Sequence, residues 1–261
     1  MDSQQLLYLI LGIVIIDYLF DQILDYLNLK NSSSELPSAL SGIYNDEEYT
    51  KSQDYQKVQS KFSFKTAAFN TLLSVTVIAL GGFGLLDGYL ANYISNPILL
   101  SLAFFGVLFI LSDIINLPFQ IHSTFGIEAK FDFNKTTVKT FVLDKLKGYL
   151  LAGVIGFLLG YAVLWLIATL GPNFWLYALI LVAVFTLFMN LFYTSLILPL
   201  FNKLSPLEDG ELKSQIEAYS SKVDFPLDHI MVIDGSKRSS KANAFFSGLG
   251  KKKKVVLYDT L

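Results

Sequence analysis

The sequence contains no cysteine, only two histidines and few charged residues. The absence of cysteine excludes disulfides and thiolate metal ligands. Charged residues make up 16% of the 261 positions whereas 53% are hydrophobic, and this chain is therefore too apolar for an ordinary soluble domain of its size. A formal net charge of −2 argues against nucleic acid as a partner. The composition predicts a membrane protein whose partner is the lipid bilayer.

Long apolar runs account for most of the chain. About 20 mostly apolar residues are needed to cross a hydrocarbon core of about 30 Å. Five stretches meet this requirement and predict transmembrane helices, near residues 6–27, 66–86, 97–119, 148–170 and 174–200. Because the last two are joined only by Gly171, Pro172 and Asn173, they are expected to form a helical hairpin. The expected fold class is a mostly α, polytopic membrane helix bundle.

Residues 201–261 predict a small α/β segment that follows the transmembrane region of residues 1–200. A helix is expected around residues 208–223, because apolar residues recur there at helical spacing, and a strand is expected at 230–233. Residues 243–246 and 255–258 are β-branched or aromatic runs separated by glycines and lysines, a pattern typical of a β-hairpin. Such a hairpin would leave an edge strand to which an extended peptide can add.

Several longer motifs carry a family resemblance. The matching segments are DGSKRSS-x-x-NAFF and VVLYDTL near the C-terminal end, and residues 44–56, 125–148 and 206–218 upstream. With these motifs in this order, the whole chain resembles the N-terminal portion of the type I CAAX prenyl proteases, integral-membrane zinc metalloendopeptidases. The resemblance implies zinc in the complete family protein, and a peptide or prenylated protein C-terminus as substrate.

The two histidines do not supply the metal site that the resemblance implies. A zinc peptidase of this kind holds its metal with a His-Glu-x-x-His helix, which in the family lies downstream of the hairpin. Neither His122 nor His229 opens such a motif, and the two lie far apart in the sequence. We expect no catalytic residue and no metal ligand set within this chain, and no peptidase activity from the chain alone.

The resemblance assigns substrate binding to Asn243, which lies in the family's Asn-Ala-Phe stretch together with Ala244 and Phe245. An amide side chain offers two donors and an acceptor, which suits a peptide backbone laid alongside an edge strand. The alternatives are a turn asparagine and hairpin-core aromatic residues. At Lys241 the sequence departs from the histidine that is commoner in the family. The serine-rich turn around Arg238 is expected to be mainly a solvated connector.

Four carboxylates lie inside predicted membrane helices, and they are Asp17, Asp21 and Asp25 in the first and Asp113 in the third. Asp17 and Asp113 are costly in hydrocarbon, so they are expected to face a bundle interior or water. The resemblance implies a water-filled chamber enclosed by the helices, which these two side chains would line. The alternative is interfacial, with Asp21 and Asp25 lying beyond the apolar core.

Three functions remain open at this point. The first is the N-terminal portion of a membrane metalloendopeptidase, and the second is a non-catalytic scaffold or paralogue that binds peptides or lipidated tails. A transporter is a distant third, suggested only by the intramembrane carboxylates. The endoplasmic reticulum and the bacterial inner membrane are equally compatible with the sequence.

The distribution of basic residues predicts the orientation. Of the 20 lysines and arginines, five fall between the first two predicted spans, five between the third and fourth, and ten after the fifth. Because basic residues flank the cytoplasmic ends of membrane spans, the N-terminus is expected outside or in the lumen and the C-terminal segment in the cytoplasm.

This orientation can be tested in a naturally cysteine-free background. Single cysteines at Asn92 and Lys135 are expected to react with a membrane-impermeant maleimide from opposite faces of the membrane. Labelling of both positions from the same face would contradict the five-span arrangement.

Overall fold

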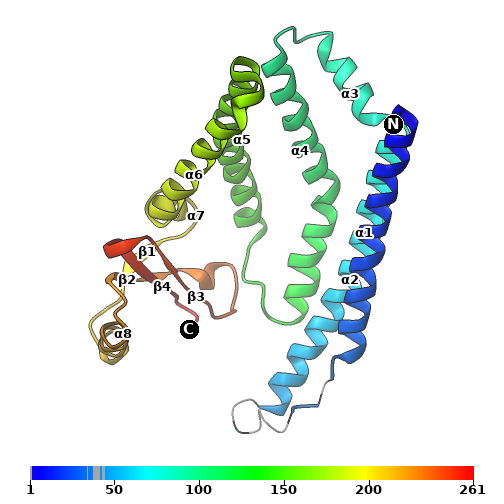
Figure 1. Ribbon diagram of the computed structural model, residues 1–261. Coiled ribbons are helices and arrows are strands. Elements are labelled where there is room, and N and C mark those ends of the chain that lie inside the picture. Colours follow the sequence, from blue (N-terminus) through cyan, green and yellow to red (C-terminus); the bar gives the residue numbers. More distant parts are fainter. Residues whose placement is uncertain (1, 34, 38–41, 43–44) are drawn as a thin grey trace. The chain divides into compact units, whose positions relative to one another are not determined.

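The computed structural model describes residues 2–33, 35–37, 42 and 45–261. The chain forms two compact units, residues 1–131 and residues 132–261, and each is described by itself. Both units are dominated by helices, and the second also carries a small sheet (Figure 1). The sequence-based division at residue 200 is of another kind, because it separates the predicted transmembrane region from the predicted cytoplasmic segment. It stays a prediction.

The first unit consists of long helices. Its elements are α1 (Ser3–Asn31), α2 (Asp46–Ala79), α3 (Gly82–Ala91), α4 (Pro97–Ile121) and a π-helical continuation of α4, His122–Glu128. Three of these helices begin at side-chain caps, and Asn45 is the cap of α2. Asp2 forms a reciprocal capping box with Gln5, and the Asn96 side chain accepts from the first backbone N–H groups of α4. α1 and α2 lie side by side (Figure 1).

The second predicted span is not one helix. α2 ends at Ala79, and Gly81 adopts a left-handed conformation with φ of +68° before α3 begins. Glycine reaches this region without the steric cost that a Cβ imposes. The stretch 66–86 therefore contains a sharp turn that the apolar pattern did not reveal, because a glycine-rich run inside a hydrophobic segment remains compatible with a helix.

Polar and aromatic contacts join α2 to α4. The Asn70 side chain donates a hydrogen bond to the Asn116 side chain, with 2.9 Å between Nδ2 and Oδ1. The Phe119 ring contacts the rings of Phe62 and Phe69, at centroid distances of 6.2 and 5.1 Å. Lipid offers no hydrogen-bond partner to an amide side chain, so two asparagines on neighbouring helices satisfy each other. The pair therefore specifies which faces of α2 and α4 meet.

The second unit begins with a helical hairpin and ends with a sheet. Its helices are α5 (Val138–Leu170), a 3-10 turn (Gly171–Asn173), α6 (Phe174–Phe192), a π-helical turn (Tyr193–Ile197), α7 (Leu198–Phe201) and α8 (Glu211–Lys222). α5 and α6 contact each other on either side of the 3-10 turn, which confirms the predicted helical hairpin (Figure 1).

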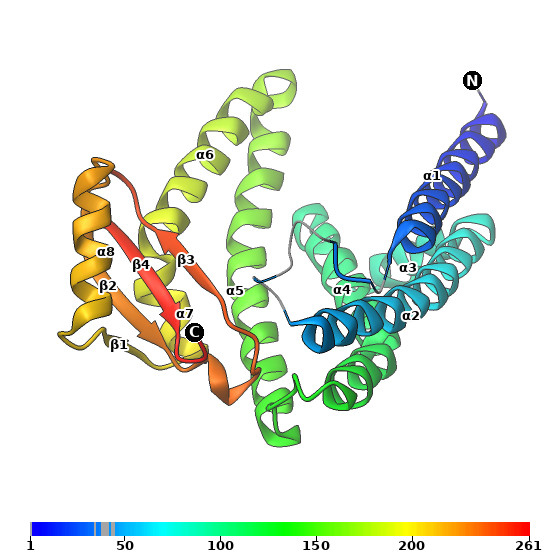
Figure 2. The same cartoon turned by 90° about the horizontal axis from the view of Figure 1, so that it is seen from below.

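The sheet has four strands in the order β1-β2-β4-β3, and its strands are β1 (Leu204–Pro206), β2 (Leu227–Ile233), β3 (Ala244–Ser247) and β4 (Lys253–Tyr258). β3 and β4 pair antiparallel, so the predicted hairpin is confirmed, and β3 lies at one edge. β2 pairs with β4 in parallel, and β1 pairs with β2 antiparallel. α8 lies beside β2 (Figure 2).

The buried core belongs mostly to this sheet. Ile233, Val256 and Leu198 form a cluster in which Val256 is completely buried, and the Phe245 side chain packs against it. The long helices α1, α2, α4, α5 and α6 contain no fully buried residue within the part of the chain that the structure describes. Apolar helix surface left exposed over such lengths is surface that lipid covers.

Four helical stretches of the described residues are long and apolar enough to cross a membrane, and they are Ser3–Asn31, Asp46–Ala79, Pro97–Glu128 and Val138–Phe201. The last extends over 64 residues and folds back at the 3-10 turn. The chain is therefore a mostly helical, multi-pass integral membrane protein with a small sheet.

Candidate functional site

The edge strand β3 presents part of its backbone away from the sheet. The Tyr258 N–H donates to the Asn243 carbonyl oxygen at 3.0 Å, and the register pairs Phe245 with Val256. Backbone groups of an antiparallel strand alternate between its two sides. The backbone groups of Phe245 and Ser247 therefore face β4, whereas those of Ala244 and Phe246 face outward.

The three residues that the sequence assigned to substrate binding lie in different surroundings. Asn243 and Ala244 are exposed, and the Asn243 Oδ1 accepts a hydrogen bond from the outward Ala244 N–H at 2.9 Å. Phe245 instead turns its side chain toward the buried cluster. Phe246, which was not among the three predicted substrate-binding residues, is 69% exposed. Its ring contacts the Phe225 ring edge-on, with 6.0 Å between the ring centroids. Counting alternate residues from Asn243 would have separated the inward phenylalanine from the outward one.

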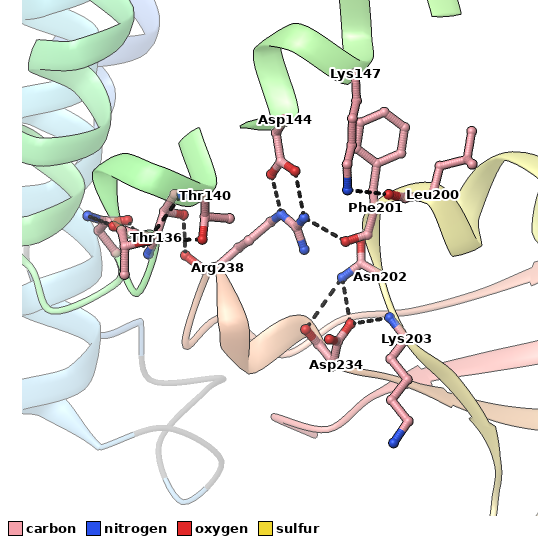
Figure 3. A network of polar contacts seen from close by, with 12 residues as sticks. Thr136, Thr140, Asp144, Lys147, Leu200, Phe201, Asn202, Lys203, Asp234 and Arg238 are labelled. Carbon is pink, nitrogen blue, oxygen red and sulfur yellow. Dashed lines mark hydrogen bonds and ion pairs between the residues drawn. The ribbon is translucent and has the colours of Figure 1, made fainter. Parts of the chain in front are cut away.

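The turn around Arg238 is not a solvated connector. Arg238 donates from Nε and Nη2 to the two carboxylate oxygens of Asp144 on α5, at 2.7 and 2.9 Å (Figure 3). The same Nη2 donates to the Phe201 carbonyl oxygen at the end of α7, at 2.7 Å. Both charged side chains are about three-quarters buried. A bidentate pair of this kind fixes orientation as well as distance.

The backbone of this turn runs along the segment that precedes α5. The Arg238 carbonyl accepts from the Lys135 N–H at 2.9 Å and from the Thr136 hydroxyl at 3.1 Å. The Ser240 N–H donates to the Phe133 carbonyl at 3.1 Å. Lys241 places its ammonium 4.8 Å from the centre of the Phe133 ring, a cation–π contact. Lys241 thus takes part in this packing.

Two aspartates hold the end of β2 in place. The Asp234 carboxylate accepts from the Lys203 N–H at 2.8 Å and from the Asn202 side chain at 3.0 Å (Figure 3). Asp259 accepts from the Ser236 N–H and hydroxyl. Burial raises the pKa of Asp259, but the hydrogen bonds from Ser236 outweigh this effect, and the pKa of this carboxyl is lowered from its usual value.

The two carboxylates that are predicted to line a chamber lie on α1 and α4. Asp17 is exposed on α1. Asp113 is half-buried on α4, and it accepts a hydrogen bond from the Gln120 side chain at 3.1 Å. An amide one to two turns further along the same helix satisfies part of the hydrogen-bonding need of a carboxylate in apolar surroundings. Whether either side chain lines a chamber stays a prediction.

Comparison with known proteins decides the family. A family model described as "CAAX prenyl protease N-terminal, five membrane helices" matches residues 25–203, and a model of "Peptidase family M48" matches residues 206–261. The chain belongs to the CAAX prenyl protease family. This family is a metallopeptidase family, and the resemblance carried by the motifs around Arg238 and Asn243 is thereby confirmed.

Relatives of the CAAX prenyl protease family match nearly the whole chain. "CAAX prenyl protease 1 homolog" of Arabidopsis thaliana is 35% identical over 260 residues, covering 97% of this chain and 61% of the relative. "CAAX prenyl protease 1" of Saccharomyces cerevisiae is 36% identical and covers 97% of this chain and 58% of its own length. The crystal structure of S. mikatae Ste24p superposes on all of this chain with a TM-score of 0.89 at 35% identity, covering 63% of that structure. The chain spans about 60% of these relatives.

Zinc, which the family implies for the complete protein, does not fit the residues that this chain brings together. In the first unit the His122 ring packs against the Phe62 ring, with 4.9 Å between the ring centroids. In the second unit His229 lies exposed on β2. No group of three or more histidines or carboxylates with metal-binding geometry occurs among the residues that the structure describes.

The Arg238–Asp144 pair predicts a measurable effect on stability. Arg238→Ala leaves Asp144 largely buried without its cation and the Phe201 carbonyl without this donor. Breaking such a pair costs about 2–4 kcal/mol, so the melting temperature in detergent is expected to fall by several degrees. The control is Lys237→Ala, which removes the neighbouring exposed cation and is expected to leave the melting temperature unchanged. Equal melting temperatures for both variants would contradict the role of the pair.

Proposed function

We propose that this chain is the N-terminal portion of a membrane-embedded zinc metalloendopeptidase that cleaves the C-terminal residues from prenylated proteins. The proposal rests on membership of the CAAX prenyl protease family and on the names of its relatives. The observation that carries it is the outward backbone of Ala244 and Phe246 on the edge strand β3. This chain contributes the membrane helices and the strand beside which the substrate lies.

Substrate binding follows from the geometry of β3. An extended peptide pairs its backbone with the outward N–H and C=O groups of Ala244 and Phe246, as a further strand. The Asn243 carboxamide already engages the Ala244 N–H, so it lies beside the first position of the added strand. A rotation about its side-chain bonds releases the Ala244 N–H to the peptide and aims the amide at the peptide backbone.

The membrane arrangement proposed here has five spans. α5 and α6 count separately, because they fold back on each other at the 3-10 turn, and this count agrees with the printed description of the family model. The N-terminus lies outside or in the lumen, and the sheet lies in the cytoplasm with the basic loops. Asp17 and Asp113 line a water-filled chamber within the helices.

A second candidate is a membrane protein that binds peptides or lipidated tails without cutting them. It rests on the same outward edge of β3, because pairing of a peptide with this edge requires no metal. The reading frame separates the two candidates. Continuation into a helix that bears His-Glu-x-x-His supports the peptidase, whereas a protein without any such helix supports the binding function.

The role of Asn243 can be tested in the protease that contains this segment. Asn243→Ala removes a hydrogen bond to the substrate backbone, which is worth about 0.5–1.5 kcal/mol, or more where a buried partner is left unsatisfied. We expect kcat/KM to fall roughly three- to thirty-fold without a change in melting temperature.

The matched control is Asn173→Ala, which removes an exposed amide in the turn between α5 and α6 and is expected to leave kcat/KM unchanged. A lower melting temperature combined with normal kcat/KM for Asn243→Ala would show that Asn243 only shapes the hairpin.

A further inference from the structure

A pocket lies between α6 and the edge strand β3. It has a volume of about 410 Å³, and its walls come from one stripe of α6 and from the end of β3. The stripe consists of Phe185, Thr186, Met189, Asn190 and Tyr193, and the strand contributes Phe245, Phe246 and Ser247. Residues at this spacing share one face of a helix. The pocket is therefore open to the same edge along which the proposed substrate backbone lies.

Polar contacts at the end of α6 hold the two walls together. The Thr194 and Ser247 hydroxyls form a hydrogen bond of 2.7 Å, and Thr194 is 5% exposed. The Lys254 ammonium donates to the Ser195 hydroxyl at 3.2 Å, between β4 and the same turn. Thr194 and Ser195 both belong to the π-helical turn Tyr193–Ile197. Such turns occur frequently at functional sites.

We propose that this pocket receives the isoprenoid chain on the substrate's modified cysteine. This inference rests on the proposed function, because it assigns a place to one part of the same substrate. The side chains of Phe185, Met189 and Phe246 give the pocket apolar walls, and its volume falls in the range of sites for small apolar ligands, roughly 300–1,000 Å³. A peptide laid on β3 carries a neighbouring side chain directly into this space.

The position of the pocket on α6 favours an isoprenoid chain, and not an ordinary apolar side chain, as its occupant. α6 belongs to the apolar stretch Val138–Phe201, whose surface is suited to lipid, and the pocket lies on the last turns of this helix. An isoprenoid dissolved in the bilayer reaches the pocket along the helix without passing through water. Each methylene that stays out of water contributes to binding, so a long isoprenoid gains more than a short side chain.

The pocket can be tested by photo-crosslinking with the purified 261-residue chain. The probe is a peptide that ends in a cysteine carrying a farnesyl analogue with a diazirine at its far end. We expect crosslinks to map to residues 185–193 or 245–247, to be removed by an excess of the ordinary farnesylated peptide, and to be reduced much less by the same excess of the unmodified peptide.

Thr186→Trp fills the pocket and is expected to weaken competition by the farnesylated peptide about tenfold, which corresponds to about 1.4 kcal/mol. Leu187→Trp, on the same helix but outside the lining stripe and 54% exposed, is the matched control and is expected to bind normally.

Met189→Ala enlarges the pocket, and we expect it to shift preference from farnesyl toward geranylgeranyl, an effect that misfolding cannot produce.

An edge-strand variant separates this inference from the proposed function. Ala244→Pro removes an outward N–H at a residue that does not line the pocket, which an edge strand tolerates, and it is expected to weaken binding of both farnesylated and unmodified peptides. If Ala244→Pro weakens binding while the crosslinks map elsewhere and Thr186→Trp has no effect, the pocket assignment is wrong and the edge-strand function stands. If crosslinking is indifferent to Ala244→Pro and to both competitors, the pocket assignment and the proposed function both fail.

Discussion

The bidentate contact between Arg238 and Asp144 is the constraint on which the arrangement of the second unit depends. One guanidinium joins the turn after β2 to α5 and to the last carbonyl of α7 (Figure 3). Lysine offers a single point charge on a flexible stem, whereas the planar fork of arginine fixes the direction from which each partner approaches. The course of the chain from β2 into β3 starts from this point, so the position of the edge strand relative to the helical hairpin follows from it.

A second connection lies at the other end of the edge strand β3. The Thr194–Ser247 hydrogen bond ties the π-helical turn after α6 to the end of β3. Between these two attachments the strand keeps its outward backbone groups and borders the pocket on α6. A helix whose surface lipid covers and the edge strand on which we propose that the peptide binds thus meet in one small region, which suits the proposed substrate of joined lipid and peptide.

The two parts of the chain are stabilised in different ways. Buried apolar residues concentrate in the sheet around Ile233 and Val256, where the hydrophobic effect operates as in a soluble domain. The long helices leave their apolar side chains exposed, because association in lipid relies on close packing and on polar pairs such as Asn70 with Asn116. The amide pair identifies which faces of α2 and α4 meet.

The sequence alone determined the membrane class, the helical hairpin around Gly171, the β3–β4 hairpin and the family, because each depends on local composition, turn chemistry or a continuous motif. It did not reveal β1, the parallel pairing of β2 with β4 or the break at Gly81. Only the tertiary structure decided that Arg238 is paired, that Phe245 points into the core while Phe246 points out, and that α6 and β3 border an open pocket. These features arise from contacts between residues that are far apart in the chain, and no local pattern encodes which distant partner a side chain meets.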